Sequence, residues 1–343
     1  MADSPYAHYG VVDPEYAKAF TPRAVKYDDV LAARQFMHEK YMPMSRERQR
    51  ANLPDASTYT IQNHAIPVDN GTTTIVVRVI TPTVSGPFPL LYHIHGGANV
   101  LAGFVMGSID SLGFTMAALS VELGIVVAQV GYRLAPEHKH PTQVNDCLEG
   151  LRWVVNNAPS LNIDLSKGFV IAGESAGASL TATITHLILD DPTFRGKQPT
   201  GQILGLPTVV DPRAYPEKYK AELRSLDMVE NAHMAVLDKQ FICDVYAKHI
   251  QNSPDDPTAS PLLFKSHANL PPALLQVSGL DLIRDEGIIY DKVLREAGVQ
   301  SELIVYPGIG HGTHFTYPEL TLSKKFHADF KNGLRAFMPG LKK

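Results

Sequence analysis

The stretch FVIAGESAGASLTATI, residues 169–184, joins a short apolar run to a helix-forming segment through Gly-Glu-Ser-Ala-Gly at 173–177. The run before the pentapeptide is typical of a buried strand, and the residues after it are typical of a helix. Glycines two positions before and two positions after a serine relieve crowding in a tight strand-to-helix turn. Such a turn holds the hydroxyl above the sheet edge, beside the unpaired N–H groups of the helix N-terminus. The spacing predicts that Ser175 is a nucleophile; the alternative is a capping serine in a packed turn.

Short apolar runs indicate further strands, and helix-forming segments separate most of them. The strands are expected at 89–95, 125–130, 169–172, 202–206, 273–277 and 302–306. The helices are expected at 108–123, 142–157, 175–189 and 285–297. Upstream, residues 59–67 and 72–80 alternate in polarity around Asp69-Asn70-Gly71, which predicts a β-hairpin. Apolar strands alternating with helices indicate an α/β fold, with a mostly parallel sheet covered on both faces.

Two segments lie outside this alternation, and we expect them to cover the ligand site. The first is helical in pattern over 25–41, and the second, within 210–255, is rich in charge and in helix-forming residues. A long insertion between strands of an open sheet commonly covers a site. We therefore predict an N-terminal helical cap segment at 1–57, a cap insertion at 210–255, and a catalytic core at 58–209 and 256–343.

A second glycine-rich segment, His-Gly-Gly-Ala at 95–98, follows an earlier strand at the same expected edge of the sheet. The backbone N–H groups of Gly96 and Gly97 can turn toward the serine because neither residue has a Cβ. A reaction at an acyl carbon needs such N–H donors to hold the developing oxyanion. The N–H of Ala176 is the third expected donor. The alternative is an ordinary glycine-rich loop between a strand and a helix.

An acid and a base are expected after the serine, each following a later strand. Asp281 follows the strand at 273–277, and His311 follows the strand at 302–306. Asp281 would orient the His311 ring, and His311 would take the serine proton and deliver it to the leaving group. Asp285 is the competing acid, although its position suits a helix terminus. His314 is the competing base.

Together these motifs resemble the hormone-sensitive-lipase branch of the α/β-hydrolases, which includes carboxylesterases and arylacetamide-deacetylase-like enzymes, over about residues 60–340. The sequence Tyr-Arg-Leu-Ala-Pro-Glu-His at 132–138 is among the most specific signatures of the branch. With Asp146, it is expected to brace the sheet and the oxyanion loop. The sequence at 281–287 resembles the acid motif of the branch, in which the first Asp is catalytic, and this favours Asp281 over Asp285.

The resemblance implies an α/β-hydrolase fold with a helical cap, and hydrolysis of carboxylic esters through an acyl-enzyme without a metal or a cofactor. The chain departs from the pattern of the branch at Ala98, at Ala102 and at Thr313. Gly96 and Gly97 remain as donors. Asn99 and Thr313 are expected to make the pocket mouth more polar than is usual in the branch.

Two other functions are compatible with these motifs. The first is a small-molecule receptor of the same fold, which is disfavoured because all three residue types of a triad are present. The second retains the triad but resolves the acyl-enzyme with an alcohol or an amine, giving acyl transfer or a lactone, or cleaves a thioester. Exclusion of water from the pocket separates this chemistry from hydrolysis, and the sequence does not report it.

Composition narrows the partners. The chain has 343 residues, a net charge of -4 and no long Lys/Arg run, which argues against nucleic acid and anionic membranes. The N-terminus lacks a signal-peptide pattern and no apolar run could span a bilayer, so a cytoplasmic location is expected. His93 and His95 could share a strand face, but no further ligand follows at a suitable spacing, so no metal site is expected. The expected partner is a small-molecule ester, and a homodimer through an edge strand is compatible with the fold.

Overall fold

The structure is a computed structural model, and it describes residues 4–21, 30–36, 53–96, 104–110, 113–228 and 237–341, with the single residues 39, 43 and 47. An eight-stranded sheet forms its centre, in the order β1-β2-β4-β3-β5-β6-β7-β8. The strands are β1 Tyr59–Val68, β2 Thr73–Pro82, β3 Leu90–Ile94, β4 Val126–Gly131, β5 Phe169–Glu174, β6 Gly201–Gly205, β7 Ala273–Ser278 and β8 Ser301–Tyr306. Each predicted strand is present, with its ends shifted by at most a few residues.

The sheet is mostly parallel, as predicted. β1 pairs antiparallel with β2, and β2 pairs antiparallel with β4. All pairs from β4 through β3, β5, β6 and β7 to β8 are parallel. Asp69, Asn70 and Gly71 turn the β1–β2 hairpin with positive φ angles of 50°, 54° and 83°. Asp, Asn and Gly adopt this left-handed region most readily, so the local sequence explains the position of the turn.

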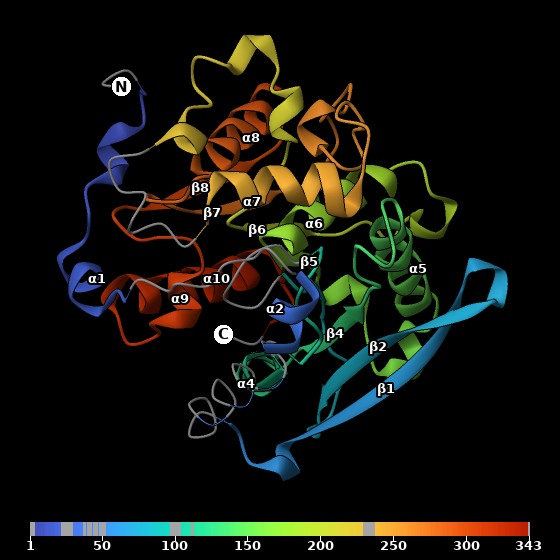
Figure 1. The fold of residues 1–343 in the computed structure, drawn as a ribbon. Coiled ribbons are helices and arrows are strands. Elements are labelled where there is room, and N and C mark those ends of the chain that lie inside the picture. The colour runs from blue at the N-terminus through green and yellow to red at the C-terminus, as the bar shows by residue number, and fades with distance from the viewer. Residues whose placement is uncertain are drawn as a thin grey trace.

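Helices cover both faces of the sheet (Figure 1). They are α1 Pro14–Ala19, α2 Val30–Phe36, α4 Gly113–Leu123, α5 Thr142–Asn156, α6 Ala176–Leu187, α7 Lys239–Asp244, α8 Arg284–Glu296, α9 Thr313–Thr316 and α10 Thr321–Phe337. A π-helix, Val245–Ile250, continues α7 directly. The four predicted helices between strands correspond to α4, α5, α6 and α8. α10 was not predicted from the sequence, although Phe326, Phe330 and Leu334 recur at helical spacing and are buried.

The two faces of the sheet bury separate apolar clusters. Leu91, Val127 and Val170 contact α4 and α10 on one face. Leu90 and Tyr92, which flank Leu91 in β3, contribute to the cluster beneath α5 and α6 on the other face. Successive side chains of a strand point to opposite faces, so an uninterrupted apolar run is needed where both faces are covered. Burial of each such side chain stabilises the fold by about 1.5–3 kcal/mol.

The two segments predicted to cover the site are described only in part. In the N-terminal segment, α1 and α2 are described, and most of the predicted helix at 25–41 lies outside the described residues. In the insertion at 210–255, residues 229–236 lie outside them as well. The domain boundaries therefore stay predictions. The cytoplasmic location and the homodimer also stay predictions. No helix within the described ranges is both long enough and apolar enough to cross a membrane.

Candidate active site

Ser175 lies in the turn between β5 and α6, with φ 56° and ψ -121°. A residue other than glycine is strained in this conformation by about 1–3 kcal/mol, so the surroundings must hold it in place. The Ser175 N–H donates to the carbonyl of Gly205 on the neighbouring strand, at 2.7 Å. The turn is therefore fixed to β6, and the hydroxyl stands at the carboxyl edge of the sheet.

The glycines on either side of Ser175 are required by close backbone contacts. A Cβ at Gly173 would lie 2.4 Å from the carbonyl oxygen of Gly177. A Cβ at Gly177 would lie 2.1 Å from the carbonyl oxygen of Ile94 on β3. Backbone atoms cannot give way as the end of a flexible side chain can. The crowding inferred from the sequence is therefore present, and it involves β3, β5 and the start of α6.

Asp281 and His311 lie beside Ser175, although 136 residues separate the serine from the histidine. His311 Nε2 is 3.1 Å from Ser175 Oγ, and His311 Nδ1 is 2.6 Å from Asp281 Oδ2. The other carboxylate oxygen of Asp281 accepts from the Ile283 N–H at 3.1 Å. His311 is 8% exposed and Asp281 is 2% exposed. The three predicted side chains thus form one continuous hydrogen-bonded chain.

The loops that carry the acid and the histidine are joined to each other and to the N-terminal segment. The Leu280 N–H donates to the Ile309 carbonyl at 3.0 Å. Gly308 donates to the carbonyl of Tyr9 and accepts from the N–H of Asp13, at 2.9 Å and 3.0 Å. Residues 9–13 therefore lie along the His311 loop and hold it in place.

The competing acid and base lie elsewhere. Asp285 pairs with the fully buried Arg284 at 2.7 Å and accepts from the backbone N–H groups of Arg224 and Ser225. It therefore anchors the 224–225 segment to the start of α8. His314 is buried and stacks on Phe326, with ring centroids 3.8 Å apart. Burial lowers the pKa of His314 well below its usual range, so this histidine is a neutral core residue.

Two of the three predicted oxyanion donors can be placed. Ala176 is the first residue of α6, and its N–H therefore has no acceptor within the helix. Gly96 directly follows His95, and a Cβ on Gly96 would lie 2.3 Å from the Glu174 carbonyl oxygen. The Gly96 backbone thus approaches the serine turn as closely as only glycine permits. Gly97, the third predicted donor, lies outside the described residues, as do Ala98, Asn99 and Ala102.

The signature at 132–138 braces this region, in agreement with the sequence prediction. The Tyr132 hydroxyl donates a hydrogen bond to the His95 carbonyl at 2.7 Å. The two rings stack, with their centroids 4.2 Å apart. Arg133 forms a bidentate ion pair with buried Asp146, through Nε at 2.9 Å and Nη2 at 2.6 Å. Arg34 of α2 reaches the same loop and pairs with Glu137. The sequence offered no signal for this contribution of Arg34.

His93 on β3 has a partner that sequence reasoning missed. His93 Nε2 lies 3.1 Å from an oxygen of Glu174, the residue that precedes the nucleophile. Glu174 therefore ties β3 to β5 directly beneath the serine turn, a position that the motif left open. Within the described ranges, no group of three or more His, Cys, Asp or Glu residues is arranged to hold a metal ion.

The expectation for Thr313 is wrong. Its side chain is 1% exposed, and its hydroxyl donates to the Gly310 carbonyl at 2.7 Å. It therefore closes the turn after His311 and does not make the pocket mouth polar. A residue at the start of a short helix can satisfy its hydroxyl locally, and the sequence does not distinguish this from exposure.

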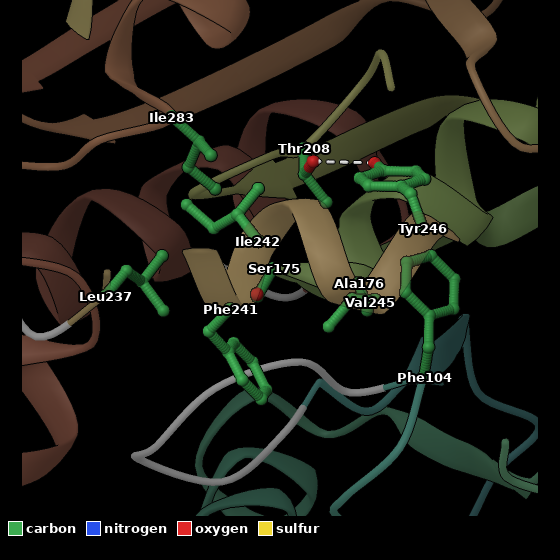
Figure 2. Close-up of a pocket in the computed structure, with 10 residues that line it drawn as sticks. All are labelled: Phe104, Ser175, Ala176, Thr208, Leu237, Phe241, Ile242, Val245, Tyr246 and Ile283. Atoms are coloured by element: carbon green, nitrogen blue, oxygen red, sulfur yellow. Dashed lines mark hydrogen bonds between the residues drawn. The ribbon is translucent and has the colours of Figure 1, made fainter. Parts of the chain in front are cut away.

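A small, mostly apolar pocket opens beside Ser175, and Figure 2 shows its side chains. Its volume is about 40 Å³. On the same measure, a cavity needs about 10–15 Å³ to hold one water molecule. α7 and the π-helix form one wall. The lining residues are Phe104, Ser175, Ala176, Thr208, Leu237, Phe241, Ile242, Val245, Tyr246 and Ile283.

A buried carboxyl group holds Thr208 and the two residues after it beside the pocket. Glu286 Oε2 accepts from the Val209 N–H at 2.8 Å and from the Thr208 hydroxyl at 3.2 Å. Its other oxygen lies 3.1 Å from the hydroxyl of Tyr215. Burial raises the pKa of Glu286 to about 8, against an ordinary value of 4.5. The 208–210 segment that follows β6 is therefore fixed by a carboxyl group that binds its proton tightly.

This raised pKa gives a pH dependence of stability. Between about pH 4.5 and pH 8 the folded protein holds a proton on Glu286 that the unfolded chain releases. The contribution of Glu286 to the free energy of unfolding therefore falls as the pH rises through this window. Glu286→Gln mimics the protonated form and does not titrate, so its stability should lack the pH dependence that Glu286 causes. We expect Tm of the wild type minus Tm of the variant to decrease from pH 5 to pH 8; a constant difference would contradict the assignment.

Comparison with known proteins places this geometry in a family. Residues 91–315 match the family described as alpha/beta hydrolase fold. An AB hydrolase superfamily protein of Schizosaccharomyces pombe is 33% identical over 295 residues, which cover 85% of this chain and 84% of that protein. The ethyl acetate hydrolase of Pseudomonas putida is 29% identical over 86% of this chain and 85% of its own. The solved structure of vibralactone cyclase superposes with a TM-score of 0.89 and 33% identity, covering 96% of both chains.

The fold and these relatives define the class of the protein as a serine hydrolase of the carboxylesterase type. The chain belongs to the α/β-hydrolase fold family, in the hormone-sensitive-lipase-like branch that its motifs resemble. The predicted family and fold are thereby confirmed.

Proposed function

We propose that the protein hydrolyses carboxylic esters of small acyl groups, with Ser175 as nucleophile, His311 as general base and acid, and Asp281 as the acid of the triad. The observation that carries the proposal is the hydrogen-bonded chain from Ser175 Oγ through His311 to Asp281, with distances of 3.1 Å and 2.6 Å. Both distances lie within the range needed for proton transfer and for orienting the ring.

In the proposed reaction, His311 Nε2 takes the Ser175 proton while Oγ attacks the ester carbonyl carbon. The N–H groups of Ala176, Gly96 and Gly97 would stabilise the oxyanion. His311 then donates the proton to the leaving alcohol, and the acyl group stays on Ser175. Water, activated by the same histidine, attacks the acyl-enzyme and releases the carboxylic acid. Asp281 accepts from His311 Nδ1 throughout and stabilises the imidazolium form.

The pocket suits the acyl side of the ester. The leaving alcohol must approach His311 to receive its proton, and His311 is not among the described residues that line the pocket. Ser175 and Ala176, which hold the acyl carbon and its oxygen in this mechanism, do line it. The volume of about 40 Å³ favours short acyl chains. The name of the Pseudomonas relative, ethyl acetate hydrolase, agrees with a small ester.

A series of p-nitrophenyl esters from acetate to laurate tests the acyl size. We expect kcat/KM to be highest for the short chains and to fall about 10-fold or more once the chain exceeds the pocket, because overpacking costs about 1–3 kcal/mol. Phe241→Ala enlarges the pocket from the α7 side and should move the optimum toward longer chains. A wild-type optimum at long chains would contradict the proposed acyl size.

A second candidate is lactone formation, in which a hydroxyl of the bound acyl group resolves the acyl-enzyme in place of water. The superposition with vibralactone cyclase favours it. Both reactions use the same triad, so loss of Ser175 does not distinguish them. Reaction of a hydroxyacyl ester in ¹⁸O-labelled water distinguishes them, because hydrolysis places the label in a free acid and cyclisation yields an unlabelled lactone.

A further inference from the structure

The acyl pocket contains one polar wall, made by the hydroxyl groups of Thr208 and Tyr246, which lie 2.8 Å apart (Figure 2). Apart from Ser175, the other described lining side chains are apolar. Thr208 follows β6, and Tyr246 is part of the π-helix. A hydroxyl pair in such surroundings matters for specificity because any polar atom left unpaired there costs free energy.

Glu286 determines the direction in which Thr208 donates. Its Oε2 atom accepts from the N–H groups of Val209 and Val210, at 2.8 Å and 3.3 Å, and faces the Thr208 hydroxyl at 3.2 Å. Backbone N–H groups can only donate, so Oε2 acts as an acceptor. Because Oε2 already accepts from two backbone N–H groups, we place the proton of the neutral carboxyl group on Oε1, which lies 3.1 Å from the Tyr215 hydroxyl. Thr208 therefore donates its single proton to Glu286 whether the carboxyl group is protonated or ionised.

Tyr246 must therefore donate to Thr208. A hydroxyl has one proton, and Thr208 has none left for the tyrosine. Burial raises the pKa of Tyr246 well above its usual range, so the phenol retains its proton. With that proton directed at Thr208, the remaining capacity of Tyr246 Oη is for accepting hydrogen bonds. The polar wall of the pocket thus presents acceptor lone pairs and no free donor.

We propose that this pocket selects short acyl groups that carry a hydroxyl near the end of the chain, with Tyr246 Oη accepting the hydroxyl proton. The inference rests on the proposed function, since it assigns the acyl group to this pocket. A plain alkyl chain leaves the Tyr246 acceptor unpaired, and an ether oxygen places a second acceptor against it. An ammonium group would lose its hydration among Phe104, Phe241 and Ile242, so a neutral hydroxyl fits better.

Three p-nitrophenyl esters with acyl chains of equal length test the proposal: butyrate, 3-hydroxypropanoate and methoxyacetate. Each kcat/KM is divided by the rate of alkaline hydrolysis of the same ester, which removes differences in intrinsic reactivity. The wild type should favour the hydroxy ester over butyrate by about 3- to 10-fold, the usual worth of one hydrogen bond. Tyr246→Phe removes the acceptor and should abolish this preference.

Thr208→Val provides a second, opposite test. It removes the acceptor for the Tyr246 proton, so that Tyr246 can donate into the pocket. The preference should then move from the hydroxy ester toward methoxyacetate, which carries an acceptor only. The fraction of folded enzyme in each preparation is counted by fluorophosphonate labelling of Ser175, and all rates are expressed per labelled serine.

Equal corrected rates for the hydroxy ester and butyrate in the wild type would overturn the inference. So would a hydroxyl preference that survives Tyr246→Phe. Failure of the proposed function looks different, because the wild type would then hydrolyse none of the three esters and Ser175 would remain unlabelled. The acceptor role of Tyr246 is supported if Tyr246→Phe loses the preference for the hydroxy ester and Thr208→Val moves the preference toward methoxyacetate.

Discussion

Replacing Ser175 by alanine is expected to lower kcat/KM for a short p-nitrophenyl ester by about 10³-fold or more. Oγ is the attacking atom in the proposed reaction, and it lies 3.1 Å from the histidine that would receive its proton. Alanine retains the Cβ and makes no new contact, so the turn between β5 and α6 should persist. Initial rates and Tm, measured on the same preparations, separate loss of chemistry from loss of folding.

Ser179 provides the matched control. It is a buried serine one helical turn further along α6, and its N–H bonds to the Ser175 carbonyl. Ser179→Ala should keep kcat/KM within a few-fold of the wild type and should still react with a fluorophosphonate. Near-full activity in Ser175→Ala would remove the serine from the mechanism and favour a binding protein of this fold.

Asp281→Asn should lower kcat on the order of 10³- to 10⁴-fold, whereas Asp285→Asn should act mainly on stability. An amide at 281 can neither hold the His311 tautomer through Nδ1 nor stabilise the imidazolium. Asp285 lies four residues along the same motif, but it compensates Arg284, which is 0% exposed. Removing the charge of a buried pair destabilises a protein by about 3–5 kcal/mol.

The two aspartate variants are compared per active site, with labelled Ser175 as the count of folded enzyme. Asp281→Asn should have a Tm near that of the wild type and a strongly reduced rate. Asp285→Asn should have a reduced Tm and a rate per labelled site within about 10-fold of the wild type. The reverse pattern would make Asp285 the acid of the triad and would contradict the proposed assignment.

Local sequence was sufficient for much of the fold. The strands were predicted because apolar runs ending at glycine reflect a property of each segment, namely a strand buried on both faces. α10 was not predicted although its buried apolar residues recur at helical spacing. The reason is that it follows the last strand and lies outside the strand–helix alternation. The 25–41 and 229–236 segments carry little motif content, and they also lie largely outside the described residues.

In the candidate site, motif spacing led to Ser175, Asp281 and His311, and the structure brings these three side chains together. The reason is that parallel strands place their carboxyl ends at one edge of the sheet, so residues that follow different strands meet there. The roles of polar residues around the site were not predictable in this way. Thr313 was expected to make the pocket mouth more polar, and it instead satisfies its hydroxyl within its own turn.

By itself, the sequence determined the eight strands and the helices that alternate with them along the chain, the glycine-lined turn at Ser175 and the branch of the family. The strands, the helices and the turn each depend on residues within one short segment, and the branch depends on several such motifs along the chain. Only the tertiary structure decided that Glu174 binds His93, that Arg34 holds the 135–137 loop and that Glu286 orients Thr208 and thereby Tyr246. These contacts join side chains from distant segments, and their hydrogen bonds follow from burial and direction in space, which periodicity along a chain does not encode.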